Sequence, residues 1–207
     1  MRRIARGGSW ELEVRRSRFV CTLARVDDQA AAAAFVAGHR RAHRDATHNC
    51  SAYVVGALGE FTRSSDDGEP AGTAGAPMLE VLVRRGLTGT AAVVTRYFGG
   101  VKLGAGGLAR AYGQAVADAV SAAGVVELVR VVSLTVALDH GPAARYLGDL
   151  RARSLTPVAV RYGASVEVDV RVPVPDADAF ERWTASATSG RALVAHGEVT
   201  HAEEPLR

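Results

Sequence analysis

The 207-residue sequence lacks the features of secreted and membrane proteins. It has two cysteines, Cys21 and Cys50, which are too few for a disulfide framework and are typical of a reducing cytosol. It has no run of about 18 apolar residues that could form a transmembrane helix. Residues 1–8 form a basic N-terminal segment that lacks the apolar core of a secretory signal. With 48% hydrophobic and 23% charged residues, the composition is that of a globular protein and excludes disorder, collagen and coiled coil. We therefore expect a cytoplasmic protein without membrane contact.

Lysine is almost absent, since Lys102 is the single lysine among 25 basic residues. Residues 1–126 hold sixteen Lys and Arg against eleven Asp and Glu, whereas residues 127–207 hold nine against eleven. The net charge of +3 thus divides into +5 and −2. Halves of opposite sign indicate two units, the first suited to an anionic partner. A solvated surface explains the same imbalance equally well.

The most distinctive motif is a glycine-rich segment at residues 98–107. It follows an apolar run at 90–97, typical of a buried strand, and precedes a helix with one apolar face. A strand, a glycine-rich loop and a helix N-terminus together can present backbone N–H groups to an anion. The P-loop pattern fails because Ala105 and Gly106 stand where it requires Lys and Ser or Thr. A tight turn that packs the helix on the sheet is the alternative interpretation.

A second unusual segment, residues 64–77, holds three glycines, two prolines and three carboxylates. This composition predicts an ordered loop that ends at a helix beginning near Pro77. Its carboxylates, Asp66, Asp67 and Glu69, could hold Mg²⁺ against a phosphate on the glycine-rich loop. We favour the interpretation that they form turns and pair with Arg96 or Lys102.

No pattern of catalytic residues is present. Gly-x-Ser-x-Gly and His-Glu-x-x-His are absent, and both cysteines lie in expected strands, where inert thiols are common. His43, Asp45 and His48 match no familiar spacing of metal ligands. We therefore expect no catalytic residues, no metal ion and no cofactor.

The remaining pattern predicts two α+β domains. In the first half we expect strands at 10–14, 19–23 and 50–55 and a helix from Asp28 to about Arg41. In the second half we expect strands at 128–137, 155–162, 165–172 and 192–200, with helices at 141–151 and from 175. The resulting order βαββαβ is the split-βαβ arrangement.

Three segments carry a family resemblance: DATHNCSAY (45–53), SDDGEPAGTAGAPML (65–79) and RYFGGVKLGAGGLARAY (96–112). Together they resemble the YigZ/IMPACT family over residues of about 15–125, and the remainder is similar to the second domain of bacterial YigZ-type members. Ala71 stands where the family usually has serine. The resemblance implies a ribosomal-protein S5 domain 2-like domain at 1–125. It also implies a ferredoxin-like domain at 126–207, similar to the C-terminal domains of elongation factor G.

The eukaryotic relative regulates translation by competing for an activator of a starvation-responsive kinase. The resemblance therefore implies a non-catalytic regulator associated with translation or the ribosome, with RNA, a phosphate-containing ligand or a translation-related protein as partner. The candidate ligand-binding residues all lie in or beside the two loops: His48, Asn49, Asp66, Asp67, Glu69, Arg96, Gly99, Gly100, Lys102, Gly104, Gly106, Gly107 and Arg110. One alternative is an enzyme that processes a nucleotide or phosphate ester on the glycine-rich loop. Another is a protein-interaction module with the acidic loop as its epitope.

Overall fold

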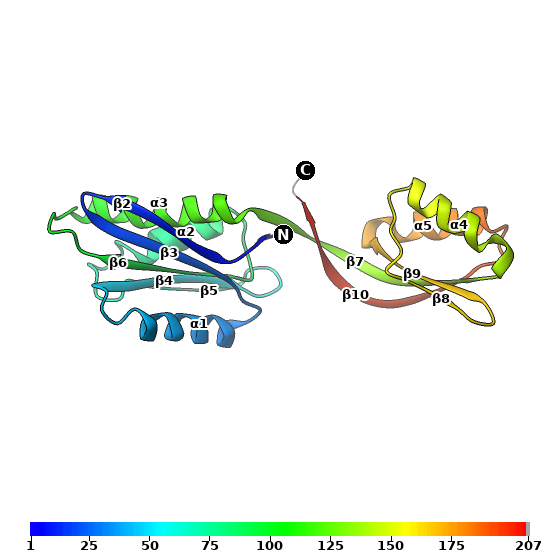
Figure 1. The fold of residues 1–207 in the computed structure, drawn as a ribbon, viewed down its shortest axis with the longest axis horizontal. Helices are drawn as coiled ribbons and strands as arrows, with labels where there is room; N and C mark the ends of the chain where they lie inside the picture. The colour runs from blue at the N-terminus through cyan, green and yellow to red at the C-terminus, as the bar shows by residue number, and fades with distance from the viewer. Residues whose placement is uncertain (206–207) are drawn as a thin grey trace. The chain divides into compact units, whose positions relative to one another are not determined.

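The computed structural model describes residues 1–205 and contains two compact units: Met1–Glu127 together with Glu204 and Pro205, and Leu128–Glu203. Each unit combines an antiparallel sheet with helices, so the predicted α+β class with two domains is confirmed (Figure 1). No helix among residues 1–205 is long and apolar enough to cross a membrane.

The first unit is built on a five-stranded antiparallel sheet in the order β2-β3-β6-β4-β5. Its strands, from one edge to the other, are β2 (Gly8–Val14), β3 (Ser17–Arg25), β6 (Thr90–Tyr97), β4 (His48–Val55) and β5 (Phe61–Ser65). The short strand β1 (Arg2–Ile4) pairs instead with the start of β7 (Val125–Leu138).

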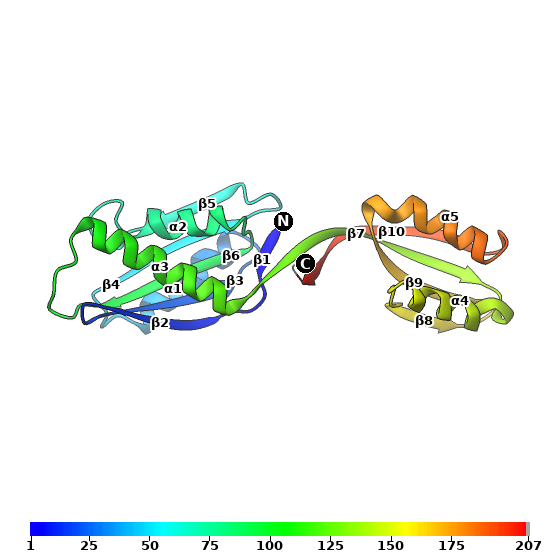
Figure 2. The same cartoon turned by 90° about the horizontal axis from the view of Figure 1, so that it is seen from above.

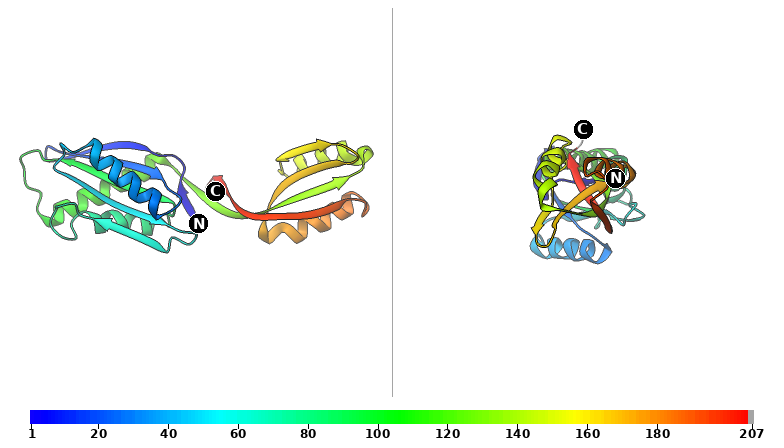
Figure 3. Two further views of the ribbon diagram at one scale, coloured as in Figure 1. Left: turned by 90° about the horizontal axis from the view of Figure 1, so that it is seen from below. Right: turned by 90° about the vertical axis from the view of Figure 1, so that its right-hand side faces the viewer.

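Helices cover both faces of this sheet. Helices α2 (Gly75–Arg84) and α3 (Ala105–Ala123) lie on one face (Figure 2), and α1 (Gln29–Ala42) lies on the other (Figure 3). The central strand β6 is therefore buried on both sides, which explains its continuous apolar run. The layout is consistent with the S5 domain 2-like fold that the resemblance implies.

The second unit has the predicted βαββαβ order and is ferredoxin-like. After β7 come α4 (His140–Ala152), β8 (Ala159–Tyr162), β9 (Val166–Pro173), the 3-10 turn η1 (Val174–Asp176), α5 (Ala177–Ala187) and β10 (Leu193–Pro205). Strand β7 is central and pairs with β9 and β10, and β9 pairs with β8. Alternate valines of β9, from Val166 to Val172, are at most 2% exposed and form the core face.

One strand was not predicted, and the acidic loop is shorter than expected. Residues 61–65 form strand β5, which the sequence does not suggest because this edge strand is largely exposed and carries few apolar residues. Helix α2 begins at Gly75, two residues before Pro77, so the acidic loop spans only residues 66–74. The earlier start follows from the Asp66 carboxylate, which accepts hydrogen bonds from the N–H groups of Ala74 and Gly75.

Candidate functional site

Two chain turns lie against each other at one end of the first unit. The loop after β6 contacts the β2–β3 hairpin turn so closely that a Cβ atom on Gly99 would lie 2.0 Å from the carbonyl carbon and oxygen of Arg16. The Gly99 N–H also donates a hydrogen bond to Ser17 Oγ at 3.2 Å. This contact fixes the loop and the hairpin as one surface and explains the need for glycine at position 99.

The hairpin turn itself has an unusual composition. Strands β2 and β3 pair from Val14 to Ser17, so only Arg15 and Arg16 form the turn. Their φ angles are 49° and 66°, a left-handed conformation that normally favours Asn-Gly. Such a conformation costs an L-residue about 1–2 kcal/mol. Strain of this kind is characteristic of functional positions, and here it displays two guanidinium groups.

Four exposed cations collect on this surface: Arg15 and Arg16 from the hairpin, Lys102 from the loop and Arg110 from α3. Within residues 1–205 none of the four forms an ion pair with a carboxylate. The same loop exposes 47% of Phe98 and 38% of Val101. We call these six residues the basic end. Its positive charge is uncompensated and lies beside exposed apolar surface.

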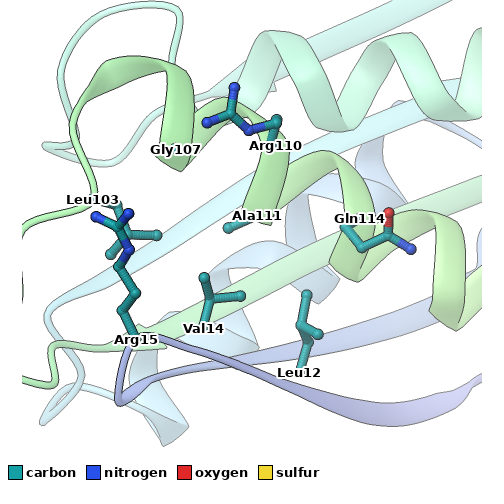
Figure 4. A pocket seen from close by; sticks show the side chains of 8 residues that line it. All are labelled: Leu12, Val14, Arg15, Leu103, Gly107, Arg110, Ala111 and Gln114. Atoms are coloured by element: carbon teal, nitrogen blue, oxygen red, sulfur yellow. The ribbon is translucent and has the colours of Figure 1, made fainter.

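A hollow of about 360 Å³ opens at the basic end between β2 and α3. Leu12, Val14, Leu103 and Ala111 provide its apolar lining, and Arg15 and Arg110 flank it from the hairpin and the helix (Figure 4). Gly107 and Gln114 complete the wall, with the Gln114 amide donating to Asp118 Oδ1 at 2.6 Å. A ligand here would meet an apolar floor and two cations.

The glycine-rich segment is only partly a loop. Helix α3 begins at Ala105, because Gly104, with φ of 73°, is its N-cap and accepts the first helical hydrogen bond from Leu108. Gly106 and Gly107 therefore lie in the first turn of α3, and the expectation that they belong to the loop was wrong. Gly99 and Gly100 do lie in the loop, and Gly100 has a φ of 83°.

Arg96, predicted as a ligand-binding residue, is 5% exposed, and its side chain binds other residues inside the first unit. Its guanidinium donates to Glu69 Oε1 at 2.6 Å, and the Tyr112 hydroxyl donates to the same oxygen at 2.8 Å. The guanidinium also lies 5.5 Å from the ring centres of Phe19 and Phe98. The predicted pairing of the acidic loop with Arg96 is confirmed, whereas Lys102 takes no part in it.

The other two acidic-loop carboxylates are also occupied. Asp66 accepts hydrogen bonds from the N–H groups of Gly72, Ala74 and Gly75. Burial raises the pKa of Asp66, but these three hydrogen bonds outweigh it and hold the pKa below its ordinary value. Asp67 accepts from the Asn49 N–H at 2.7 Å and forms an ion pair with Arg40 at 2.9 Å. These contacts hold the loop in its conformation, and both carboxylates are bound to partners within the protein.

His48 and Asn49 anchor the acidic loop to the start of β4. The His48 Nδ1–H donates to the Asp67 carbonyl at 2.8 Å, and its Nε2 lies 3.8 Å from Glu69 Oε2. The Asn49 amide donates to the His43 carbonyl and accepts from the Thr95 hydroxyl. The predicted site residues thus separate into an internal group around Glu69 and an exposed group around Lys102.

Both cysteines are buried, and the histidines join no metal-binding cluster within the described residues. No cluster of three or more His, Cys, Asp or Glu within residues 1–205 is arranged to hold a metal ion. Both cysteines are 0% exposed, and burial raises the pKa of the Cys50 thiol to about 12. The Cys50 S–H donates to the Asp66 carbonyl at 2.9 Å, so this thiol is part of the packing.

Four of the six residues of the basic end were not among the predicted site residues: Arg15, Arg16, Phe98 and Val101. Arg15 and Arg16 lie about 85 positions before the glycine-rich loop, and only the pairing of β3 with β6 brings the two together. A signal was nevertheless present in the sequence, since two arginines occupy a hairpin turn where asparagine and glycine are usual.

Comparison with known proteins gives the same two-part organisation. Residues 15–120 match the Impact N-terminal domain, and residues 136–191 match a domain of unknown function, DUF1949. The IMPACT family member YvyE of Bacillus subtilis is 40% identical over 203 residues, which cover 98% of this chain and 94% of YvyE. YigZ of Escherichia coli is 50% identical over 109 residues, 52% of this chain and 53% of YigZ.

A crystal structure described only as that of a hypothetical protein is also similar. It is 34% identical, has a TM-score of 0.60, and the match covers 95% of this chain and 97% of the other. Both domain models and a relative matched over nearly the whole length agree, and the chain therefore belongs to the IMPACT family.

Proposed function

We propose that this protein regulates translation by binding RNA, free or within the ribosome, through the basic end of its first unit. Membership of the IMPACT family supports a non-enzymatic regulatory protein in general terms. The observation that carries the RNA proposal is the convergence of Arg15, Arg16, Lys102 and Arg110, all exposed and without carboxylate partners among the described residues.

The chemistry of this surface fits a single-stranded nucleic acid. Phosphates pair with unpaired arginines and lysines, and this interaction supplies most non-specific affinity. Phe98 is 47% exposed beside them, and exposed aromatic rings stack with bases at about 1–3 kcal/mol per base. The apolar hollow next to Arg15 and Arg110 can receive part of a splayed base.

Fluorescence anisotropy with a labelled oligouridine strand, measured over a series of salt concentrations, tests the proposal. We expect affinity to fall with salt, and Lys102→Gln or Arg110→Gln each to reduce the slope of log K against log salt by about 0.7. Arg145→Gln, on the exposed face of α4 in the second unit, is the matched control and should leave the slope unchanged. Binding that does not depend on salt, or that falls equally in the control, would overturn the proposal.

One observation favours the nucleotide-processing alternative. The first turn of α3 has no side-chain cap, so the N–H groups of Ala105 and Gly106 are available beside Lys102. Thermal denaturation with ATP–Mg²⁺ distinguishes the two, because a ligand that binds the native state raises Tm. Stabilisation by ATP–Mg²⁺ without stabilisation by RNA would replace the RNA proposal with the enzymatic one.

A further inference from the structure

A second hollow, of about 400 Å³, lies between α1 and the strands β4 and β5, on the face of the sheet opposite α3. Its helical wall consists of four residues on one face of α1: Ala33, Val36, Ala37 and Arg40. Because two of these four residues are alanines, the helix does not fill the space above the sheet edge. The hollow is thus a consequence of the alanine-rich sequence of α1.

The floor is formed by two cross-strand pairs. Ser51 of β4 pairs with Ser65 of β5, and Tyr53 pairs with Arg63, so all four side chains share one face. A helix packed on a sheet normally covers apolar residues, and polar residues beneath it require an explanation. Here three of the four floor residues are serine or arginine.

Several of these polar groups lack partners. Ser51 is 6% exposed, yet within residues 1–205 its hydroxyl makes no hydrogen bond. At the same hollow, the buried Nε of Arg40 also has no hydrogen-bond partner among the described residues, so the hollow offers donors to a bound acceptor. The Tyr53 hydroxyl and the solvent-exposed Arg63 guanidinium likewise have no partner among the described residues.

The charge that a ligand of this hollow should carry follows from the lining residues. Arg40 is held in place by Asp67 at 2.9 Å and by Ser65 Oγ at 3.2 Å, where the serine oxygen accepts and keeps its own proton available. No carboxylate lines the hollow. Because Asp67 compensates Arg40, the Arg63 guanidinium leaves an excess of one positive charge beside three hydroxyls, which favours an anionic acceptor.

We propose that this groove binds a phosphomonoester whose apolar body lies against Ala33, Val36 and Ala37. A phosphate has three terminal oxygens and suits the number of donors better than the two oxygens of a carboxylate. The volume of about 400 Å³ lies in the range of small-molecule sites. This site is separate from the basic end and does not depend on RNA binding there.

Phenyl phosphate is the probe, with benzoate and inorganic phosphate for comparison, in calorimetric titrations of the full chain. Phenyl phosphate should bind most tightly and shift the backbone amide resonances of Ser51, Arg63 and Ser65. Arg63→Gln should weaken binding by about tenfold or more, because a charged hydrogen bond is lost. Ala37→Leu should weaken it similarly by filling the groove, while leucine preserves the helix.

Arg41→Gln is the matched control, since Arg41 is exposed on the same turn of α1 and does not line the groove. It should leave phenyl phosphate binding unchanged, and Ala37→Leu should leave oligouridine binding unchanged. Equal binding by the native protein, Arg63→Gln and Ala37→Leu would overturn the proposal, as would amide shifts confined to residues 98–110. Benzoate binding as tightly as phenyl phosphate would overturn the assignment to phosphate.

Discussion

Glu69 and Arg96 connect the acidic loop to the end of β6 through an ion pair that is almost wholly buried. Their side chains are 3% and 7% exposed, and the Glu69 carboxylate also accepts from Tyr112. Burial raises the pKa of the Tyr112 hydroxyl, which therefore stays protonated and donates. A buried pair of this kind is costly to break, because removing one charge leaves the other without compensation.

Glu69→Gln should lower the free energy of unfolding by about 3–5 kcal/mol, because Arg96 then remains buried and charged without its partner. The double variant Glu69→Gln with Arg96→Met should recover part of this loss, since it also removes the buried charge. Urea denaturation measures both. A double variant less stable than the single one would contradict this explanation.

Asp66 gives the stability of the protein a defined pH dependence. Its pKa is lowered in the folded state, so its stabilising contribution is complete above the unfolded-state pKa of about 3.9 and is lost as pH falls through the folded pKa. In this acidic range, Asp66→Asn should therefore reduce the rise of unfolding free energy with pH. Urea denaturation at several pH values tests this, with the exposed Asp45→Asn as control.

At the scale of elements, two glycines of the same segment have opposite roles. Gly99→Ala should destabilise the protein by about 1–3 kcal/mol, because the new Cβ would overlap the Arg16 backbone. Gly106→Ala should stabilise it by about 0.5–1 kcal/mol, because Gly106 lies within α3 and its Cβ would meet only the end of the Arg110 side chain, at 3.7 Å. Thermal denaturation distinguishes the two, and equal effects would contradict the assignment of the start of α3.

The turn of the β2–β3 hairpin carries two arginines at positions where Asn and Gly would be more stable. Replacing Arg15 and Arg16 with Asn and Gly should raise the free energy of unfolding by about 1–3 kcal/mol, because both positions have positive φ. The same change should reduce the salt slope of oligouridine binding by about 1.4, as two phosphate contacts are lost. Urea denaturation and anisotropy measure these effects, and a variant that gains no stability would contradict the role assigned to the turn.

At the scale of the whole molecule, each unit has its own hydrophobic core. Leu82 belongs to the core of the first unit and Leu134 to that of the second, and both are at most 1% exposed. Leu82→Ala and Leu134→Ala should each cost about 2–5 kcal/mol by leaving a cavity.

Hydrogen exchange should show which unit loses stability in each variant. We expect Leu134→Ala to lower amide protection chiefly within Leu128–Glu203, and Leu82→Ala chiefly within Met1–Glu127. Loss of protection spread equally over both units by either variant would show a single cooperative structure instead.

Local patterns determined most of the elements. The continuous apolar run of β6 and the alternating valines of β9 predict both strands closely, because each pattern reflects the number of faces that are buried. Strand β5 escaped prediction because an exposed edge strand needs no apolar alternation. Helix α2 begins earlier than expected because Asp66, nine residues before Gly75, binds its first N–H groups.

The sequence by itself determined the two α+β domains, the family and the two loops that carry the candidate residues, because these depend on local composition and ordered motifs. The tertiary structure decided which of those residues are available. It buried Glu69 and Arg96 against each other and left Lys102 and Arg110 exposed, because burial depends on strands and loops distant in the chain. It also placed Arg15 and Arg16 beside the glycine-rich loop, since the antiparallel pairing of β3 with β6 brings those two turns to the same end of the sheet.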